Sequence, residues 1–205
     1  MDSKEIAMEA LALTCVQHNF LHKYLDDHSF TKPSPISSSF PLELLMQISK
    51  DDRFNDVAAN TPFSDLETVL NNHEEAVLEY WNGWNLDDPT KQFELSQEAA
   101  VAMFVATVRP GSHAYNFFVV HVLTTSHAVR VLLPLIPSEH HVALVREWWL
   151  LAISAFILRG RPAPDPANVS DDLKGRRWSY VEDKALRSPW SKDAHYVKGA
   201  LIHAH

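Results

Sequence analysis

Residues 112–133 read SHAYNFFVVHVLTTSHAVRVLL, a run in which apolar residues recur at spacings of three and four. That spacing is typical of a helix rather than of a strand. Ser112 is a residue type that often caps a helix start, and Pro134 cannot continue a helix, so the sequence predicts one long helix from Ser112 to Leu133. His121 lies in the most apolar part of this run.

The same spacing extends outward over most of the chain, and no run alternates convincingly between apolar and polar residues. Glycine is scarce, at 5 residues, and the 12 prolines cluster between the periodic segments. We therefore expect one all-α domain over residues 1–205, an irregular multi-helix bundle without significant β-sheet, in which residues 31–62 form a linker rich in loops. The expected helices are residues 3–26, 42–49, 64–81, 89–108, 112–133, 138–158, 174–186 and 191–203.

Composition narrows the classes of partner. The 205 residues carry a formal net charge of -8 and no basic cluster, which argues against nucleic acid and anionic membranes as partners. Cys15 is the one cysteine, so neither an intrachain disulfide nor a cysteine-based zinc site is possible. The first residues lack the features of a signal peptide, and the apolar run Trp148–Leu158 is too short to span a bilayer. We expect a cytoplasmic protein without a membrane segment.

The 12 histidines are more than a chain of this length usually contains. His18 and His22 lie four residues apart on the first expected helix, which is a spacing that metal ligands use. The pattern resembles that of zinc proteases, but Asn19 stands where those enzymes carry a general-base glutamate, so protease chemistry is not expected. The simpler interpretation is one hydrogen-bonded histidine and one surface histidine.

His121 is the second candidate ligand. Thr124 and Thr125 follow one turn later and are candidates to orient a bound substrate. The aromatic side chains of Phe117 and Trp148 are candidates to form the wall of a pocket for a flat aromatic molecule. The alternative is that His121 is a core residue bonded to a backbone carbonyl, and that the tryptophans belong to the core.

His195 and Lys198 lie three residues apart near the end of the chain and would share one helix face. Histidines that converge from distant helices are how an all-helical protein builds a metal site. A protonated lysine cannot ligate a metal, but a lysine carbamate is an oxygen ligand suited to iron or manganese. Such a lysine must be buried, and the alternative is an exposed Lys198 paired with Asp193.

Four segments together resemble the questin oxidase-like family. They are EALALTCVQH at residues 9–18, NFFVVHVLTTSHAVRVLLP at residues 116–134, RGRP at residues 159–162 and DAHYVK at residues 193–198. The resemblance covers nearly the whole chain, which looks like the C-terminal half of such a protein. It implies a Baeyer–Villiger-type oxidase of fungal secondary metabolism that opens the ring of an anthraquinone-like polyketide. It also implies NADPH as a cofactor and no recognisable flavin domain.

If the family site is a histidine-rich non-haem iron centre, the resemblance implies His121, His195 and His18 as ligands, with Lys198 as the candidate carbamate. No residue is assigned to proton transfer or to NADPH binding. The alternative function is a non-catalytic helical remnant or accessory subunit, which would bind an aromatic product, self-associate or need a partner that supplies the other half.

Overall fold

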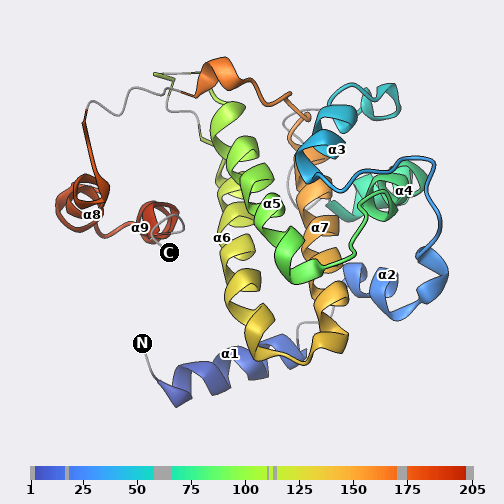
Figure 1. Ribbon diagram of the computed structural model, residues 1–205, viewed down its shortest axis with the longest axis horizontal. Helices are drawn as coiled ribbons and strands as arrows, with labels where there is room; N and C mark the ends of the chain where they lie inside the picture. The colour runs from blue at the N-terminus through green and yellow to red at the C-terminus, as the bar shows by residue number, and fades with distance from the viewer. Residues whose placement is uncertain are drawn as a thin grey trace. The chain divides into compact units, whose positions relative to one another are not determined.

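The computed structural model describes residues 3–16, 19–57, 66–109, 111–112, 115–169 and 175–201. The chain divides into two compact units, Met1–Lys32 and Pro33–His205, a division that the sequence does not predict. Over the described residues the regular structure is helical, and the one β-type contact is an isolated parallel bridge between Ser38 and Trp84. The predicted all-α fold is confirmed (Figure 1).

The first unit is broken into short pieces where the sequence predicts one helix over residues 3–26. A separate 3-10 turn begins after Asn19. The Asn19 side chain caps this turn by accepting a hydrogen bond from the backbone N–H of Leu21 at 2.9 Å. Asparagine favours such caps over helix interiors, since its side chain competes for backbone groups. The pieces are α1 (Lys4–Val16), η1 (Phe20–His22), α2 (Lys23–Asp26) and η2 (His28–Phe30).

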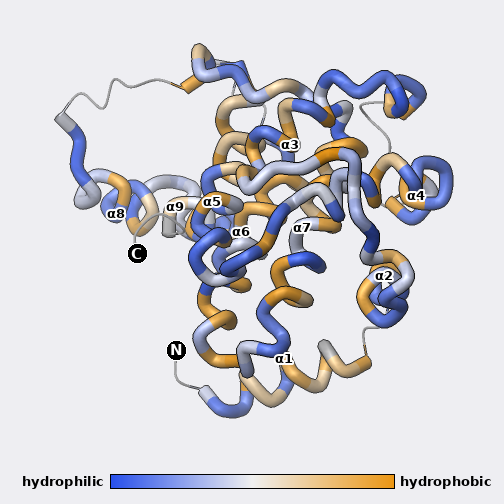
Figure 2. Tube along the Cα trace, turned by 45° about the vertical axis from the view of Figure 1, so that its right-hand side comes forward, coloured by the Kyte–Doolittle hydropathy of each residue, from blue (hydrophilic) through white to orange (hydrophobic). Residues whose placement is uncertain are grey.

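Helix α1 is apolar along most of its length, as Figure 2 shows. Met8, Leu11 and Val16 are each about two-thirds exposed or more, at 70%, 66% and 74%. A helix with apolar side chains on all sides is normally a buried one. The exposed apolar side chains of α1 therefore form a candidate surface for association.

The second unit is a helical bundle built around α7. Most side chains of α7 from Val145 to Leu158 are buried, including Trp148 and Trp149. Helices α4, α5 and α6 all contact α7, and α5 and α6 run alongside it in Figure 1. The elements are α3 (Pro41–Ile48), η3 (Asp52–Phe54), α4 (Leu66–Asn82), α5 (Pro89–Val101), η5 (Ala102–Ala106), α6 (Phe117–Leu132), η6 (Leu133–Leu135), η7 (Ser138–His140), α7 (His141–Leu158), η8 (Pro166–Asn168), α8 (Trp178–Arg187) and α9 (Ala194–Leu201).

Indole hydrogen bonds join the central helices. The Nε1–H of Trp149 on α7 donates to the Tyr80 carbonyl of α4 at 3.2 Å, and that of Trp81 on α4 donates to the Arg146 carbonyl of α7 at 2.9 Å. Trp148 likewise donates to the Val122 carbonyl of α6 at 3.2 Å. These three buried indoles are thus satisfied across helix interfaces, whereas the buried Nε1–H of Trp84 has no hydrogen-bond partner among the described residues.

Helix α6 begins later than the sequence predicts. Asn116, not Ser112, is its cap, and the Asn116 side chain accepts from the backbone N–H groups of Phe118 at 2.9 Å and Val119 at 3.3 Å. Both residue types are good caps, so only the tertiary structure distinguishes them. The predicted helix over residues 89–108 also changes character, because α5 ends at Val101 and continues as the π-helical turn η5.

The linker after Lys32 lies against the end of α4. Ser38 N–H donates to the Gly83 carbonyl at 2.9 Å, and Asn85 N–H donates to the Ser38 carbonyl at 2.9 Å. A Cβ atom at position 83 would lie 3.0 Å from the Glu79 carbonyl oxygen and 3.1 Å from that of Ile36. Only glycine fits this close approach without a backbone shift.

A charged cluster fixes the turn η3 to helix α4. Asp51 accepts hydrogen bonds from the Arg53 guanidinium at 2.7 Å and from the Tyr80 hydroxyl at 2.9 Å. Arg53 also donates to Glu79 at 2.7 Å. The hydrogen bonds from Arg53 are the main reason that the pKa of Asp51 falls to about 2. Burial, more than its bond to Asp51, raises the pKa of Tyr80 to about 12.

Two helical stretches among the described residues, 117–135 and 138–158, are long and apolar enough to cross a membrane by length and composition alone. Trp148–Leu158, the run judged too short from the sequence, is only the second half of the longer apolar stretch 138–158. In the second stretch, 61% of the most apolar window is buried inside the protein, so packing against α4, α5 and α6 accounts for its composition. The absence of a membrane segment stays a prediction.

Candidate functional site

Helix α6 presents two aromatic rings one turn apart near its start. Phe117 and His121 lie at positions i and i+4, and their ring centroids are 4.7 Å apart in an edge-to-face arrangement. The Asn116 cap sets where the helix begins and hence the direction in which this pair points.

Helix α9 adds a second histidine to this pair. Asp193 holds the start of α9, because its carboxylate accepts from the backbone N–H groups of His195 at 2.8 Å and Tyr196 at 3.0 Å. The His195 ring then lies 5.1 Å from the His121 ring, nearly perpendicular to it at 87°, and 4.8 Å from the Phe117 ring. The two histidines that the sequence singled out from distant segments are therefore neighbours. We call Phe117, His121 and His195 the histidine cluster.

The local electrostatics favour a neutral His121. Loss of solvent around the ring lowers its pKa below the usual value, and the positive charges of His195 and Lys198 lower it further. His195 itself has a carboxylate nearby, since its Nδ1 lies 3.7 Å from Asp193 Oδ1. The pKa of Asp193 is lowered, mainly by the backbone hydrogen bonds from Tyr196 and His195. His121 is thus available as a proton acceptor near neutral pH.

The histidine cluster is more open than the sequence indicated. His121 is exposed, Phe117 is 54% exposed and the His195 side chain is 41% exposed. In the structure His121 lies on the exposed side of α6, because the buried side of this helix runs through other positions. Those positions are Val119, Val120, Val122, Leu123, Ser126 and Val129.

Lys198 lies on α9 close enough to act on His121, but it is exposed. A carbamate-forming lysine has to be buried, so the condition on which the carbamate interpretation depended is not met. His18 lies outside the described residues. Its predicted part in the site therefore has no structural counterpart to describe.

The other residues predicted to contact substrate, Thr124, Thr125 and Trp148, form hydrogen bonds within the protein. Thr124 and Thr125 hydroxyls donate to the His121 carbonyl at 3.2 Å and 2.8 Å. Trp148 is buried in the core, with its ring 5.3 Å from that of Phe93. The structure therefore places Phe117 beside the two histidines, whereas the buried Trp148 donates to the Val122 carbonyl of α6.

The described residues do not complete a metal centre. Among them no group of three histidine, cysteine, aspartate or glutamate side chains could hold a metal ion. Catalytic zinc and non-haem iron sites use three protein ligands, whereas the histidine cluster supplies two imidazoles. The described part of the chain therefore does not fit the iron centre that the resemblance implies.

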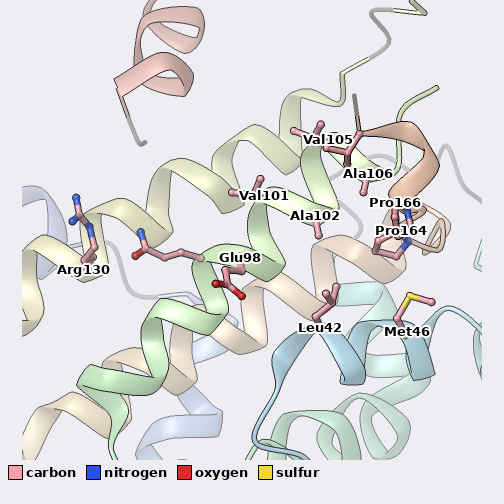
Figure 3. Close-up of a pocket in the computed structure, with 12 residues that line it drawn as sticks. Leu42, Met46, Glu98, Val101, Ala102, Val105, Ala106, Arg130, Pro164 and Pro166 are labelled. Carbon is pink, nitrogen blue, oxygen red and sulfur yellow. The ribbon is translucent and has the colours of Figure 1, made fainter. Parts of the chain in front are cut away.

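A pocket of about 770 Å³ lies elsewhere in the second unit and was missed by the sequence reasoning. It is bounded by α3, by α5 and its continuation η5, by Arg130 of α6 and by the segment around η8 (Figure 3). We call it the α5 pocket. Its lining residues are Leu42, Met46, Gln97, Glu98, Val101, Ala102, Val105, Ala106, Arg130, Pro164, Pro166 and Val169.

The wall of the α5 pocket is held by one carbonyl group. The Ala106 carbonyl accepts from the Asp165 N–H at 2.9 Å and from Asn168 Nδ2 at 2.8 Å. In a continuous α-helix this carbonyl would pair with the N–H of residue 110, but Pro110 has none. Pro110 is the only sequence signal for this arrangement, because it leaves the Ala106 carbonyl without its usual helical donor.

Comparison with protein families matches residues 1–200 to the family described as Questin oxidase-like. Searches of curated proteins and of solved structures found no match. The matched range contains every residue of the histidine cluster and of the α5 pocket.

Proposed function

The chain belongs to the questin oxidase-like family, and on that premise we propose that it oxidises an aromatic polyketide, inserting oxygen into the ring of an anthraquinone-like substrate. The family name points to an oxidoreductase. The observation that carries the proposal is the histidine cluster, which joins two segments that lie far apart in the sequence.

The chemistry of the cluster suits a hydroxylated aromatic substrate. The exposed ring of Phe117 offers a face on which a flat molecule can stack. His121, with its lowered pKa, can accept a phenolic proton, and the ammonium group of Lys198 would favour the resulting phenolate. A phenolate is richer in electrons than a phenol and is more readily oxidised.

The overall reaction that we propose is of the Baeyer–Villiger type. One atom of dioxygen enters the bond between a ring carbonyl and its neighbouring carbon, and the other atom leaves as water. NADPH would supply the two electrons, and one proton from solvent would balance the equation. His121 would hold and return the phenolic proton, so it is not consumed.

No step is assigned to iron, because the described part of the chain brings two imidazoles together, which is fewer ligands than such a centre uses. Elemental analysis of the purified protein and of a His121→Ala/His195→Ala variant tests whether iron is bound nevertheless. Near-stoichiometric iron that is lost in the variant would show that further ligands complete the site.

The activity test is incubation of the purified chain with a hydroxyanthraquinone, NADPH and isotopically labelled dioxygen, followed by mass spectrometry of the product. We expect one labelled oxygen in the product and a large loss of turnover in His121→Ala and in His195→Ala. The control is His140→Ala, which removes an exposed histidine outside the cluster. Unchanged substrate with the wild-type protein, or equal activity in all three variants, would refute the proposal.

A second function, an accessory subunit, is favoured by the exposed apolar side chains of α1 and by Leu186 and Trp190 near α8. Leu186 is 73% exposed and Trp190 is 62% exposed. Exposed apolar surface of this kind marks sites of association. Sedimentation velocity over a range of protein concentrations tests this function. Concentration-dependent association without turnover would support it, and an active monomer would count against it.

A further inference from the structure

The α5 pocket is separate from the histidine cluster. Nine residues separate His121 from Arg130 on α6, which at 3.6 residues per turn places them on opposite sides of the helix. Arg130 lines the α5 pocket, whereas His121 faces α9. A ligand in the pocket therefore does not have to contact the histidines.

The volume and the construction of the α5 pocket are those of a ligand site. About 770 Å³ falls within the range of small-molecule pockets in proteins. Ala102 and Ala106 leave space where larger apolar residues would fill the core, and the π-helical turn that carries them belongs to a class often found at functional sites. The hydrogen bonds to the Ala106 carbonyl from Asp165 and Asn168 hold the opposite wall in place.

The walls select an aliphatic ligand. None of the 12 lining residues is aromatic, and most carry aliphatic side chains or proline rings. A flat aromatic molecule would find no ring to stack on, whereas an alkyl chain gains dispersion contacts along the whole wall. Met46 adds a flexible side chain that adapts to irregular apolar shapes.

The polar groups lie toward one end. Figure 3 shows Arg130 and Glu98 on one side of the pocket and Val105, Ala106 and Pro166 on the other. Gln97 precedes Glu98, so an amide, a carboxylate and a guanidinium line this end, and Arg130 Nη2 also lies 3.1 Å from His127 Nδ1. From Gln97 to Ala106 the helix extends roughly 13 Å at about 1.5 Å per residue. This length suits a chain of medium length better than a compact ring system.

We propose that the α5 pocket binds a medium-chain alkyl amphiphile, with the chain along α5 and η5 and an oxygen-containing head group at Gln97 and Arg130. A fatty alcohol and a fatty acid share this chemistry. The proposal does not depend on the oxidase reaction, because the pocket and the histidine cluster have no residue in common.

The test is isothermal titration calorimetry with decanol and with decanoate, each below the concentration at which it aggregates. Ala102→Leu fills the pocket and should weaken binding at least about tenfold. The matched control, Ala128→Leu, makes the same change at an exposed position of α6 outside the pocket and should leave the affinity unchanged. Binding of decanol alone or decanoate alone identifies the head group, and either supports the proposal.

A second variant tests the same pocket if Ala102→Leu does not fold. Gln97→Leu changes a half-buried residue at the polar end and should weaken binding severalfold, whereas His121→Ala should not affect it. Absence of saturable binding by the wild-type protein would overturn the proposal. So would equal weakening in Ala128→Leu, or tighter binding of a hydroxyanthraquinone that displaces decanol.

Discussion

Replacing Asp51 by asparagine removes the negative charge that joins the turn η3 to helix α4 while keeping the shape of the side chain. In the folded protein the pKa of Asp51 falls from 3.8 to about 2, first because of hydrogen bonds from Arg53. A shift of that size corresponds to about 2.4 kcal/mol of stability at neutral pH. Since the Arg53 side chain is 43% exposed and solvent screens the pair, we expect Asp51→Asn to cost about 1–2 kcal/mol.

The pH dependence gives the sign of the effect. A carboxylate with a depressed pKa stabilises the fold above its unfolded pKa of 3.8, and this contribution disappears as the pH falls through about 2. Urea unfolding followed by circular dichroism at pH 7 and pH 3 measures the difference, which should fall to about half at pH 3. The control is Asp52→Asn, which removes the same charge from the adjacent, exposed residue. A cost at pH 7 within about 0.5 kcal/mol of this control, or one independent of pH, would refute the reasoning.

Three further measurements address the core, the helix start and the histidine cluster. Trp149→Ala should lower the free energy of unfolding by about 3–5 kcal/mol, because it leaves a cavity in the core and removes a hydrogen bond to α4. The control Trp190→Ala, at a 62% exposed position, should change the free energy of unfolding by less than about 0.5 kcal/mol. Asn116→Ala should cost about 1 kcal/mol in the same chemical unfolding assay, because α6 loses its cap, and no loss would show that another residue caps it. In an NMR titration, the pKa of His121 should rise in His195→Ala because a neighbouring positive charge is removed, and an unchanged pKa would contradict the proximity of the two rings.

The sequence predicts the helices best where the apolar spacing is long and uninterrupted. Residues 138–158 were expected as one helix, and η7 and α7 occupy that range because both the apolar pattern and the prolines before it agree. The start of α6 was predicted at the wrong residue, because Ser112 and Asn116 are equally good caps. The turn η5 has no clear signal in apolar spacing, since its i→i+5 hydrogen bonding extends over only five residues, too few to show a different period.

The candidate site was predictable in part. His121 and His195 were singled out by residue type and helical position, and the structure places them side by side. Their exposure was not anticipated, because the apolar neighbours of His121 in the sequence point to other sides of α6. The α5 pocket joins α3, α5 and the segment around η8, and such a combination depends on tertiary packing that no local pattern encodes.

Helix α9 carries one of the two histidines of the histidine cluster, yet none of its side chains from Ala194 to Ala200 is buried. Few buried contacts mean a low free energy of local opening, so α9 is expected to detach from α6 well before the bundle unfolds. Any ligand that needs both histidines then binds only the fraction of molecules in which α9 is docked, and its apparent affinity is reduced by that fraction. A molecule or partner that holds α9 in place would raise the affinity of the cluster without touching either imidazole.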